Sequence, residues 1–278
     1  MRRVLFQARL LGNGTEEQAV SAAVRAYADN MSTATNSARL ATLAHRAAYD
    51  AMGCDDPYRE LKSRSDEIAL GHLPSMERLV EEADDRFRTA VLISIIGNVM
   101  DFGSGISIDD PGEFDEQVED LLARGVDPEA VGRFREKVDA SENIVYIFDN
   151  CGESQFDRLL IRELRRMGKR VVGVVRGAPI LNDVTLEDAV RIGLDDELDR
   201  MLTTNAFAIG VDLDLIGADL REELASADLI VAKGMANYES LSDERPGAPV
   251  VYLMRAKCIP VAASLGVEVG TNVVHLQV

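Results

Sequence analysis

The sequence contains no tryptophan, has only three cysteines and lacks any apolar run long enough to cross a membrane. A membrane-spanning helix needs about 18 or more largely apolar residues, and the start, MRRVLFQARL, lacks the apolar stretch and cleavage site of a secretory signal. The odd number and wide spacing of Cys54, Cys151 and Cys258 argue against a disulfide framework and favour reduced thiols. We therefore expect a cytoplasmic protein that does not bind a membrane.

Basic residues are scarce relative to acidic ones. The chain has 30 Lys and Arg against 48 Asp and Glu, a formal net charge of −18 and a pI near 4.6. A field of this sign repels nucleic acid and anionic lipid, which disfavours polyanionic partners. Five of the basic residues are lysines and the others are arginines. Scarce lysine with excess acid predicts a salt-rich cytoplasm.

Several catalytic patterns are also absent. The sequence has no G-x-S-x-G, P-loop or G-x-G-x-x-G motif, which disfavours a serine hydrolase, a P-loop NTPase and a dinucleotide enzyme. The three histidines, His45, His72 and His275, show no metal-ligand spacing, and each is more often a surface or core residue than a catalytic one.

The first half of the chain, residues 1–140, has a helical pattern and is predicted to form an all-helical domain. Residues 15–51 are rich in alanine and contain no proline, and Thr15 is placed to open this segment with a capping box. The segment RFRTAVLISIIGNVMDFG is apolar on nearly all sides, which predicts a buried helix ending near Gly97 or Gly103. RGVDPEAVG is expected to form part of the connection to the second half.

The second half, residues 141–278, is predicted to be an α/β domain. Short runs rich in β-branched residues are mostly separated by helical patterns, which indicates a mostly parallel sheet with helices on both faces, a three-layer α/β/α fold. The predicted strands are NIVYIF, KRVVGVV, ADLIVAKG, APVVYLM and NVVHLQV. Ligands of such sheets bind at the carboxyl ends of the strands.

Acidic and amide side chains follow two of these strands. Asp149 and Asn150 come directly after the first, and Asp183 lies in the loop after the second. Because parallel strands are about 4.8 Å apart, side chains at neighbouring strand ends can share one cation, and Mg²⁺ prefers such oxygen ligands. The alternative is an ordinary turn, since Asn, Asp and Gly are common turn residues.

Two lysines and a polar pair complete the set of candidate residues. Lys233 follows a buried strand and Gly234 lets the backbone approach a ligand, so Lys233 is placed to bind phosphate, while Lys257 is the second candidate cation. A solvated lysine in a turn is the alternative for Lys233. Asn98 and Asp101 interrupt an apolar segment, and either find partners in the core or line the pocket.

Five motifs together resemble the damage-control phosphatase family, and its archaeal branch most closely. They are GNVMDFG, FDNCGESQFD, APILNDVTLEDA, KGMANYES and RAKCIPVA, and the similarity covers nearly the whole chain. The resemblance implies that Asp149, Asn150 and Asp183 hold a metal. It also implies that Lys233, with its neighbours as far as Asn237, binds the substrate phosphate, as does Lys257. Relatives typically have a Cys-x-x-Cys pair just before the segment matching RRVLFQARL, and none stands there in this sequence.

The expected function is metal-dependent hydrolysis of phosphomonoesters of small metabolites such as sugar phosphates. Asp149, Asp183 and Lys233 are the expected catalytic residues, with Mg²⁺ or Mn²⁺ as the cation and Co²⁺ or Ni²⁺ as further metals that fit. One alternative is an aspartyl phosphatase of the haloacid dehalogenase type, which needs an acid where Cys151 stands. Another is a metal- or nucleotide-binding module without turnover. A methyltransferase ranks low because no glycine-rich S-adenosylmethionine loop is present.

Overall fold

The structure, a computed structural model, describes residues 1–31, 36–97, 120 and 122–278. Its α-helices are α1 (Arg2–Leu11), α2 (Glu16–Asn30), α3 (Ser37–Met52), α4 (Arg59–Glu82), α5 (Arg86–Ile96), α7 (Pro128–Asp139), α8 (Glu153–Arg166), α9 (Leu186–Arg191), α10 (Ala218–Ser226), α11 (Gly234–Leu241) and α12 (Ile259–Leu265). Its strands are β1 (Asn143–Ile147), β2 (Arg170–Val175), β3 (Arg200–Thr203), β4 (Leu229–Lys233), β5 (Val250–Arg255) and β6 (Asn272–Gln277).

The six strands form one sheet in the order β3-β2-β1-β4-β5-β6. All neighbours are parallel except β5 and β6, which are antiparallel. The chain leaves β1 toward β2 on one side and returns to β4 on the other, so the strand order reverses between β1 and β4. Ligands of open α/β sheets bind at such a switch point, outside the carboxyl ends of the strands. The topology therefore places the expected site above β1 and β4.

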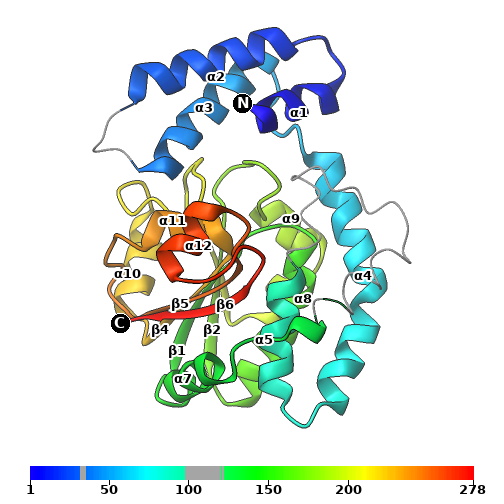
Figure 1. Ribbon diagram of the computed structural model, residues 1–278, viewed down its shortest axis with the longest axis vertical. Helices are drawn as coiled ribbons and strands as arrows, with labels where there is room; N and C mark the ends of the chain where they lie inside the picture. Colours follow the sequence, from blue (N-terminus) through cyan, green and yellow to red (C-terminus); the bar gives the residue numbers. More distant parts are fainter. Residues whose placement is uncertain (32–35, 98–119, 121) are drawn as a thin grey trace.

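Helices cover both faces of the sheet, as Figure 1 shows, and the predicted α/β architecture is confirmed. Alternate residues of β1 point to opposite faces, with Ile144 and Tyr146 in one hydrophobic cluster and Val145 and Ile147 in the other. The first cluster includes residues of α4, α5, α7 and α8, and the second includes residues of α10, α11 and α12. Residues on both sides of the predicted domain boundary at residue 140 thus share one core.

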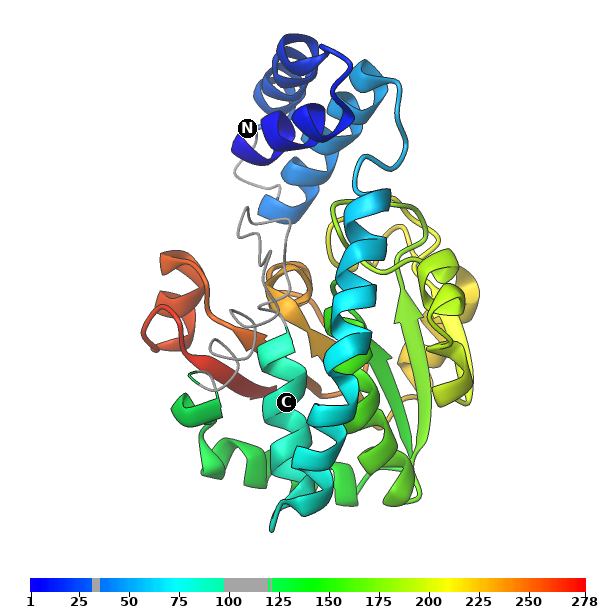
Figure 2. The same cartoon turned by 90° about the vertical axis from the view of Figure 1, so that its right-hand side faces the viewer.

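The first three helices form a cap at one end of the molecule, and α4 runs from this cap along the α/β part (Figure 2). The cap has a small hydrophobic cluster of its own, built largely from alanines of α1, α2 and α3. Within the described ranges, no helix combines the length and apolar composition needed to span a membrane.

Most elements agree with the sequence pattern, and the exceptions have local causes. The predicted buried helix ends at Gly97, as expected. RGVDPEAVG, predicted as a connection, contains the start of α7, because the Asp127 side chain caps the helix and Pro128 occupies its first turn. Thr15 precedes α2 but forms no capping box, since its hydroxyl donates to Asn13 Oδ1 at 2.6 Å. The edge strand β3 was not predicted, because RMLT lacks a β-branched run.

Candidate active site

The loops that follow β1 and β2 are joined by backbone hydrogen bonds. Cys151 N–H donates to the carbonyl of Asn182 at 2.9 Å, and Val184 N–H donates to the carbonyl of Asp149 at 2.9 Å. Asn150 and Asp183 form an isolated antiparallel bridge between these two bonds. The backbone therefore holds the two loops side by side, as the strand-end positions in the sequence predicted.

A buried arginine, Arg176, lies against both carboxylates. It directly follows β2, and its Nε donates to Asp183 Oδ2 at 2.6 Å while Nη2 lies 3.6 Å from Asp149 Oδ1. Only 1% of Arg176 is exposed, so burial strengthens this attraction between opposite charges. The sequence analysis did not identify Arg176, although its strand-end position was a usable signal.

The Asn150 amide is fixed by two acceptors. Nδ2 donates to Asp149 Oδ2 at 2.8 Å and to Glu153 Oε2 at 3.2 Å. Because the amide nitrogen is used in this way, the amide oxygen is the Asn150 atom left to bind a cation. Asp149, Asp183 and Asn150 Oδ1 form an all-oxygen donor set, which suits a hard divalent cation such as Mg²⁺ or Mn²⁺. Elsewhere in the described part of the chain, no three His, Cys, Asp or Glu side chains form a metal-binding group.

Gly234 allows the start of α11 to lie against this donor set. Its φ is +75°, and a Cβ at this position would stand 1.9 Å from Asp149 Oδ2. Any side chain would therefore displace the Asp149 carboxylate. The predicted close approach of the backbone at Gly234 is present, and what it approaches is Asp149.

The ammonium group of Lys233, which was predicted to bind phosphate, lies in the protein core and does not line the cavity described below. It is fully buried, and Nζ donates to Ser94 O at 2.7 Å, to Glu153 Oε1 at 2.6 Å and to Asp157 Oδ1 at 2.6 Å. These three bonds use all three donors of the ammonium. The placement does not fit direct phosphate binding; Lys233 instead supports Glu153, which in turn holds Asn150.

Lys233, Glu153 and Asp157 form a buried cluster of opposite charges. Burial favours a neutral Lys233, but the charges of Asp157 and Glu153 and the hydrogen bonds that Lys233 donates to both outweigh burial and raise the pKa of Lys233. Burial raises the pKa of Asp157 to about 7 against the opposing charge of Lys233. Lys233 is therefore a permanent cation that offsets two buried acids.

Asn237, predicted to contact substrate, is also fully buried. Its Nδ2 donates to the carbonyls of Phe148 at 3.1 Å and Lys233 at 2.6 Å. It joins the residues at the ends of β1 and β4, which lie on either side of the switch point. Its amide nitrogen is thus engaged in holding the site together.

A cavity of about 260 Å³ opens above the donor set. From the strand ends it is lined by Asp149, Asn150, Asp183, Gly234, Arg255 and Lys257, and from the cap by Arg3 and His45. Lys257 therefore lies where the sequence predicted a cation. The two other predicted substrate contacts, Asn98 and Asp101, lie outside the described residues.

Comparison with known proteins shows the family to which the chain belongs. The family model of the damage-control phosphatase ARMT1-like domain matches residues 1–273. The chain belongs to the damage-control phosphatase family. It is 40% identical to a damage-control phosphatase of Archaeoglobus fulgidus over 275 residues, which cover 98% of this chain and 94% of that protein. The similarity supports phosphatase activity, and the resemblance in the sequence is confirmed.

Two further relatives come from Pyrococcus horikoshii and Methanocaldococcus jannaschii. The chain is 37% identical to the damage-control phosphatase of P. horikoshii, over 81% of this chain and 76% of that relative. It is 39% identical to an uncharacterised protein of M. jannaschii, over 84% of this chain and 78% of that relative. The crystal structure of a DUF89 family protein from P. horikoshii has a TM-score of 0.84 and 32% identity, covering 98% of this chain and 93% of that one. The fold of this family member is thus that of a solved relative.

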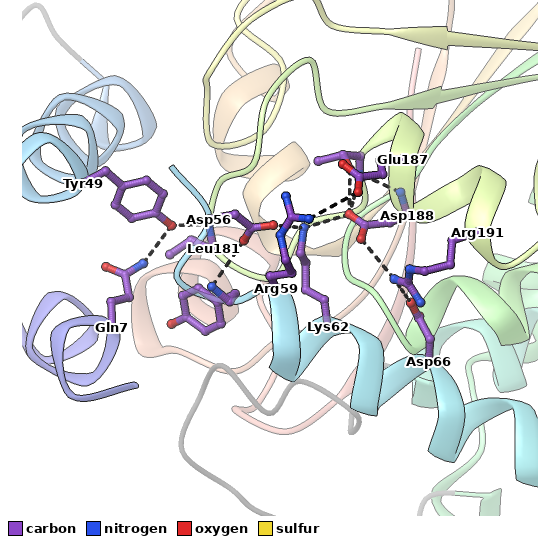
Figure 3. A network of polar contacts seen from close by, with 12 residues as sticks. Gln7, Tyr49, Asp56, Arg59, Lys62, Asp66, Leu181, Glu187, Asp188 and Arg191 are labelled. Atoms are coloured by element: carbon purple, nitrogen blue, oxygen red, sulfur yellow. Dashed lines mark hydrogen bonds and ion pairs between the residues drawn. The ribbon is translucent and has the colours of Figure 1, made fainter. Parts of the chain in front are cut away.

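A chain of polar contacts links the cap of this damage-control phosphatase family member to the loop that carries Asp183. His45 Nδ1 lies 3.0 Å from Gln7 Oε1, Gln7 Nε2 donates to the Tyr49 hydroxyl at 3.1 Å, and that hydroxyl accepts from Leu181 N–H at 3.0 Å. Figure 3 shows Tyr49 reaching from the cap toward Leu181. Leu181 has a φ of +50°, a conformation that non-glycine residues rarely adopt.

The opposite side of the loops is held by α4, as Figure 3 also shows. Lys62 Nζ lies 2.8 Å from Oδ2 of Asp188, the residue that forms the capping box of α9 with Thr185. Asp66 Oδ1 accepts from Gly152 N–H at 2.6 Å, directly after the loop that carries Asp149 and Asn150. These buried contacts fix both loops from α4, and the sequence pattern carried no sign of them.

Proposed function

We propose that the protein is a metal-dependent phosphatase that hydrolyses phosphomonoesters of small metabolites such as sugar phosphates. The observation that carries the proposal is the convergence of Asp149, Asn150 and Asp183 beside Gly234, at the switch point of the sheet, where all four line one cavity. Family membership supports the phosphatase reaction. The size of the cavity suits a small metabolite, since drug-sized ligands occupy about 300–1,000 Å³.

Asp149, Asn150 and Asp183 would hold the cation. A divalent ion bound there would polarise a phosphoryl oxygen and lower the pKa of a bound water molecule. Arg176 offsets the charge of the two carboxylates, because its guanidinium contacts both. Glu153, supported by Lys233, keeps the Asn150 amide turned so that its oxygen faces the ligand.

The start of α11 would receive the phosphoryl oxygens. Met235 and Ala236 line the cavity within the first turn of this helix. Their backbone N–H groups lie at the positive end of the helix dipole, which favours an anion. Lys257 lines the same cavity and would offset the charge of the transferred group.

His45 would recognise a hydroxyl group of the metabolite. Burial and the nearby charge of Arg3 lower the pKa of His45 to about 4, so the ring is neutral near pH 7. Because an amide oxygen only accepts, Nδ1 donates to Gln7 and Nε2 is left as an acceptor. A neutral acceptor in the cavity wall suits a sugar hydroxyl.

The aspartyl phosphatase alternative is weaker. That mechanism needs an acid two residues after the nucleophilic Asp149, and Cys151 occupies the position. Cys151 is buried, and burial together with the charge of Asp66 raises the pKa of its thiol well above the ordinary value. A neutral thiol cannot replace the carboxylic acid of that mechanism.

The proposal is tested by phosphate release from a panel of phosphomonoesters after removal of metals with a chelator. Mg²⁺, Mn²⁺, Co²⁺ or Ni²⁺ is then added back to the parent, to Asp183→Asn and to Asp29→Ala, an exposed acid on α2 outside the cavity. Metal-dependent release that is lost in Asp183→Asn and kept in Asp29→Ala is the expected result. Tight metal binding without release from any ester would favour the binding-module alternative.

A further inference from the structure

Two basic residues at the end of β5 line the same cavity as the metal-ligand candidates. Arg255 ends β5 and Lys257 follows it, and both line the cavity. β5 is two strands away from β1 in the sheet, on the far side of β4. At about 4.8 Å per strand, the two ends of the cavity are about 10 Å apart.

Arg255 has a partly buried guanidinium without a matching acid. Within the described part of the chain it forms no ion pair, and its Nη1 lies 3.4 Å from the neutral Asn272 Oδ1. Burial and the like charge of Arg124 lower its pKa. By contrast, hydrogen bonds to Glu197 and Glu223 raise the pKa of Arg162 and Arg170.

The charges around the cavity leave room for an anion. Beyond the metal-ligand candidates, Glu239 is the carboxylate that lines the cavity from the described residues, against the cations Arg3, Arg255 and Lys257. Arg3 already acts on Glu239, since its charge opposes the rise in the Glu239 pKa that burial causes. Three cations and three carboxylates of the described residues thus line the cavity. A divalent cation held by Asp149 and Asp183 would leave a surplus of positive charge, which favours a negatively charged ligand.

We propose that the substrate carries a second anionic group, and that Arg255 binds it, while Lys257 offsets the charge of the phosphoryl group that is hydrolysed beside Asp149 and Asp183. The inference rests on the proposed function, whose site it extends. The separation of the two ends fits a sugar with a phosphate at one end and a phosphate or carboxylate at the other. Arg255 supplies a fork of donors that matches either group.

Three matched esters test the proposal: glucose 6-phosphate, glucose 1,6-bisphosphate and 6-phosphogluconate. With metal present, we expect kcat/KM for at least one of the two esters with a second anionic group to exceed that of glucose 6-phosphate at least about tenfold, or about 1.4 kcal/mol. Arg255→Gln should remove most of this preference. Arg133→Gln, an exposed arginine on α7 outside the cavity, changes the net charge equally and should keep it.

Preference for the bisphosphate alone assigns the subsite to phosphate, and preference for both esters with a second anionic group assigns it to anions in general. No preference in the parent, or a preference unchanged in Arg255→Gln, overturns the proposal. Calorimetry of glucose 1,6-bisphosphate with the metal-free protein separates this question from turnover. If no ester is hydrolysed but Arg255→Gln alone weakens binding of glucose 1,6-bisphosphate, the proposed function fails and the subsite stands. If the parent does not bind this ester, or if all variants bind it equally, the subsite is contradicted.

Discussion

The buried charges of this site are stable only because oppositely charged neighbours contact them. Arg176 would be an unstable buried charge without Asp183 and Asp149, and those carboxylates would repel each other without Arg176 or a cation. Lys233 is similar, because its ammonium group is stable in the core only beside Glu153 and Asp157. Residue type alone therefore does not reveal which of these charges faces the ligand.

Gly234→Ala should abolish phosphate release while the protein stays folded. The new Cβ would overlap the Asp149 carboxylate, and φ of +75° adds a conformational cost of about 1 kcal/mol or more. Gly266→Ala is the matched control, because Gly266 has φ of +67° and open space around its Cβ position. Similar unfolding temperatures with activity lost only in Gly234→Ala would support a direct effect on Asp149; equal activity would contradict it.

Lys233→Met should destabilise the protein by about 3–5 kcal/mol, because it leaves Glu153 and Asp157 buried without their cation. Urea unfolding measures the change. Lys169→Met, which removes an ammonium bonded to the carbonyls of Asp139 and Ser141, should cost about 1 kcal/mol. Equal losses for the two variants would mean that the buried carboxylates do not need Lys233.

At the scale of elements, the position of the cap decides what the cavity can bind. α1 and α3 bring Arg3 and His45 over the strand ends, and Tyr49 ties α3 to the loop that precedes Asp183. Sequence periodicity identified these helices but did not indicate where they pack. Their small alanine cluster and polar contacts to the α/β part explain why a weakly apolar segment is held there.

The cap should also contribute a pH-dependent part of the stability. The pKa of His45 falls from 6.5 to about 4 on folding, mainly through burial and secondly through Arg3. Protons therefore bind the unfolded chain more tightly, so the contribution is complete above pH 6.5 and is lost as the pH falls toward 4. The loss should reach about 3 kcal/mol at most, from the size of this shift.

Urea unfolding between these pH values, compared for the parent and His45→Gln, measures this contribution. The variant should show a smaller loss of stability toward low pH than the parent. His72→Gln on α4, outside the cavity, should keep the pH dependence of the parent. Identical pH profiles for the parent and both variants would contradict a buried, neutral His45.

At the scale of the whole molecule, the net charge of −18 should make stability depend on salt. Repulsion among surface carboxylates opposes folding, and salt screens it with a Debye length that falls from about 10 Å at 0.1 M to about 3 Å at 1 M. The unfolding temperature should therefore rise as KCl increases over this range. A temperature that is highest in low salt would argue against adaptation to a salt-rich cytoplasm.

Three of the five lysines of the chain lie in buried ion pairs or line the cavity. Of the five lysines, Lys62 and Lys233 are buried in ion pairs and Lys257 lines the cavity. The exposed cations are mostly arginines. The rarity of lysine was therefore a signal in the sequence for positions with a special environment, although it did not say whether the partner was a ligand or another side chain.

The sequence by itself determined the α/β fold, five of the six strands and the polar residues at the strand ends, because side-chain periodicity and turn chemistry are local properties. The convergence of Asp149, Asn150 and Asp183 also followed from it, since parallel strands end at the same edge. The tertiary structure alone decided that Lys233 faces Glu153 rather than the cavity, that Arg176 joins the carboxylates, and that Arg255 lies opposite them. Ion pairing and burial depend on residues distant in the chain, which no local pattern encodes.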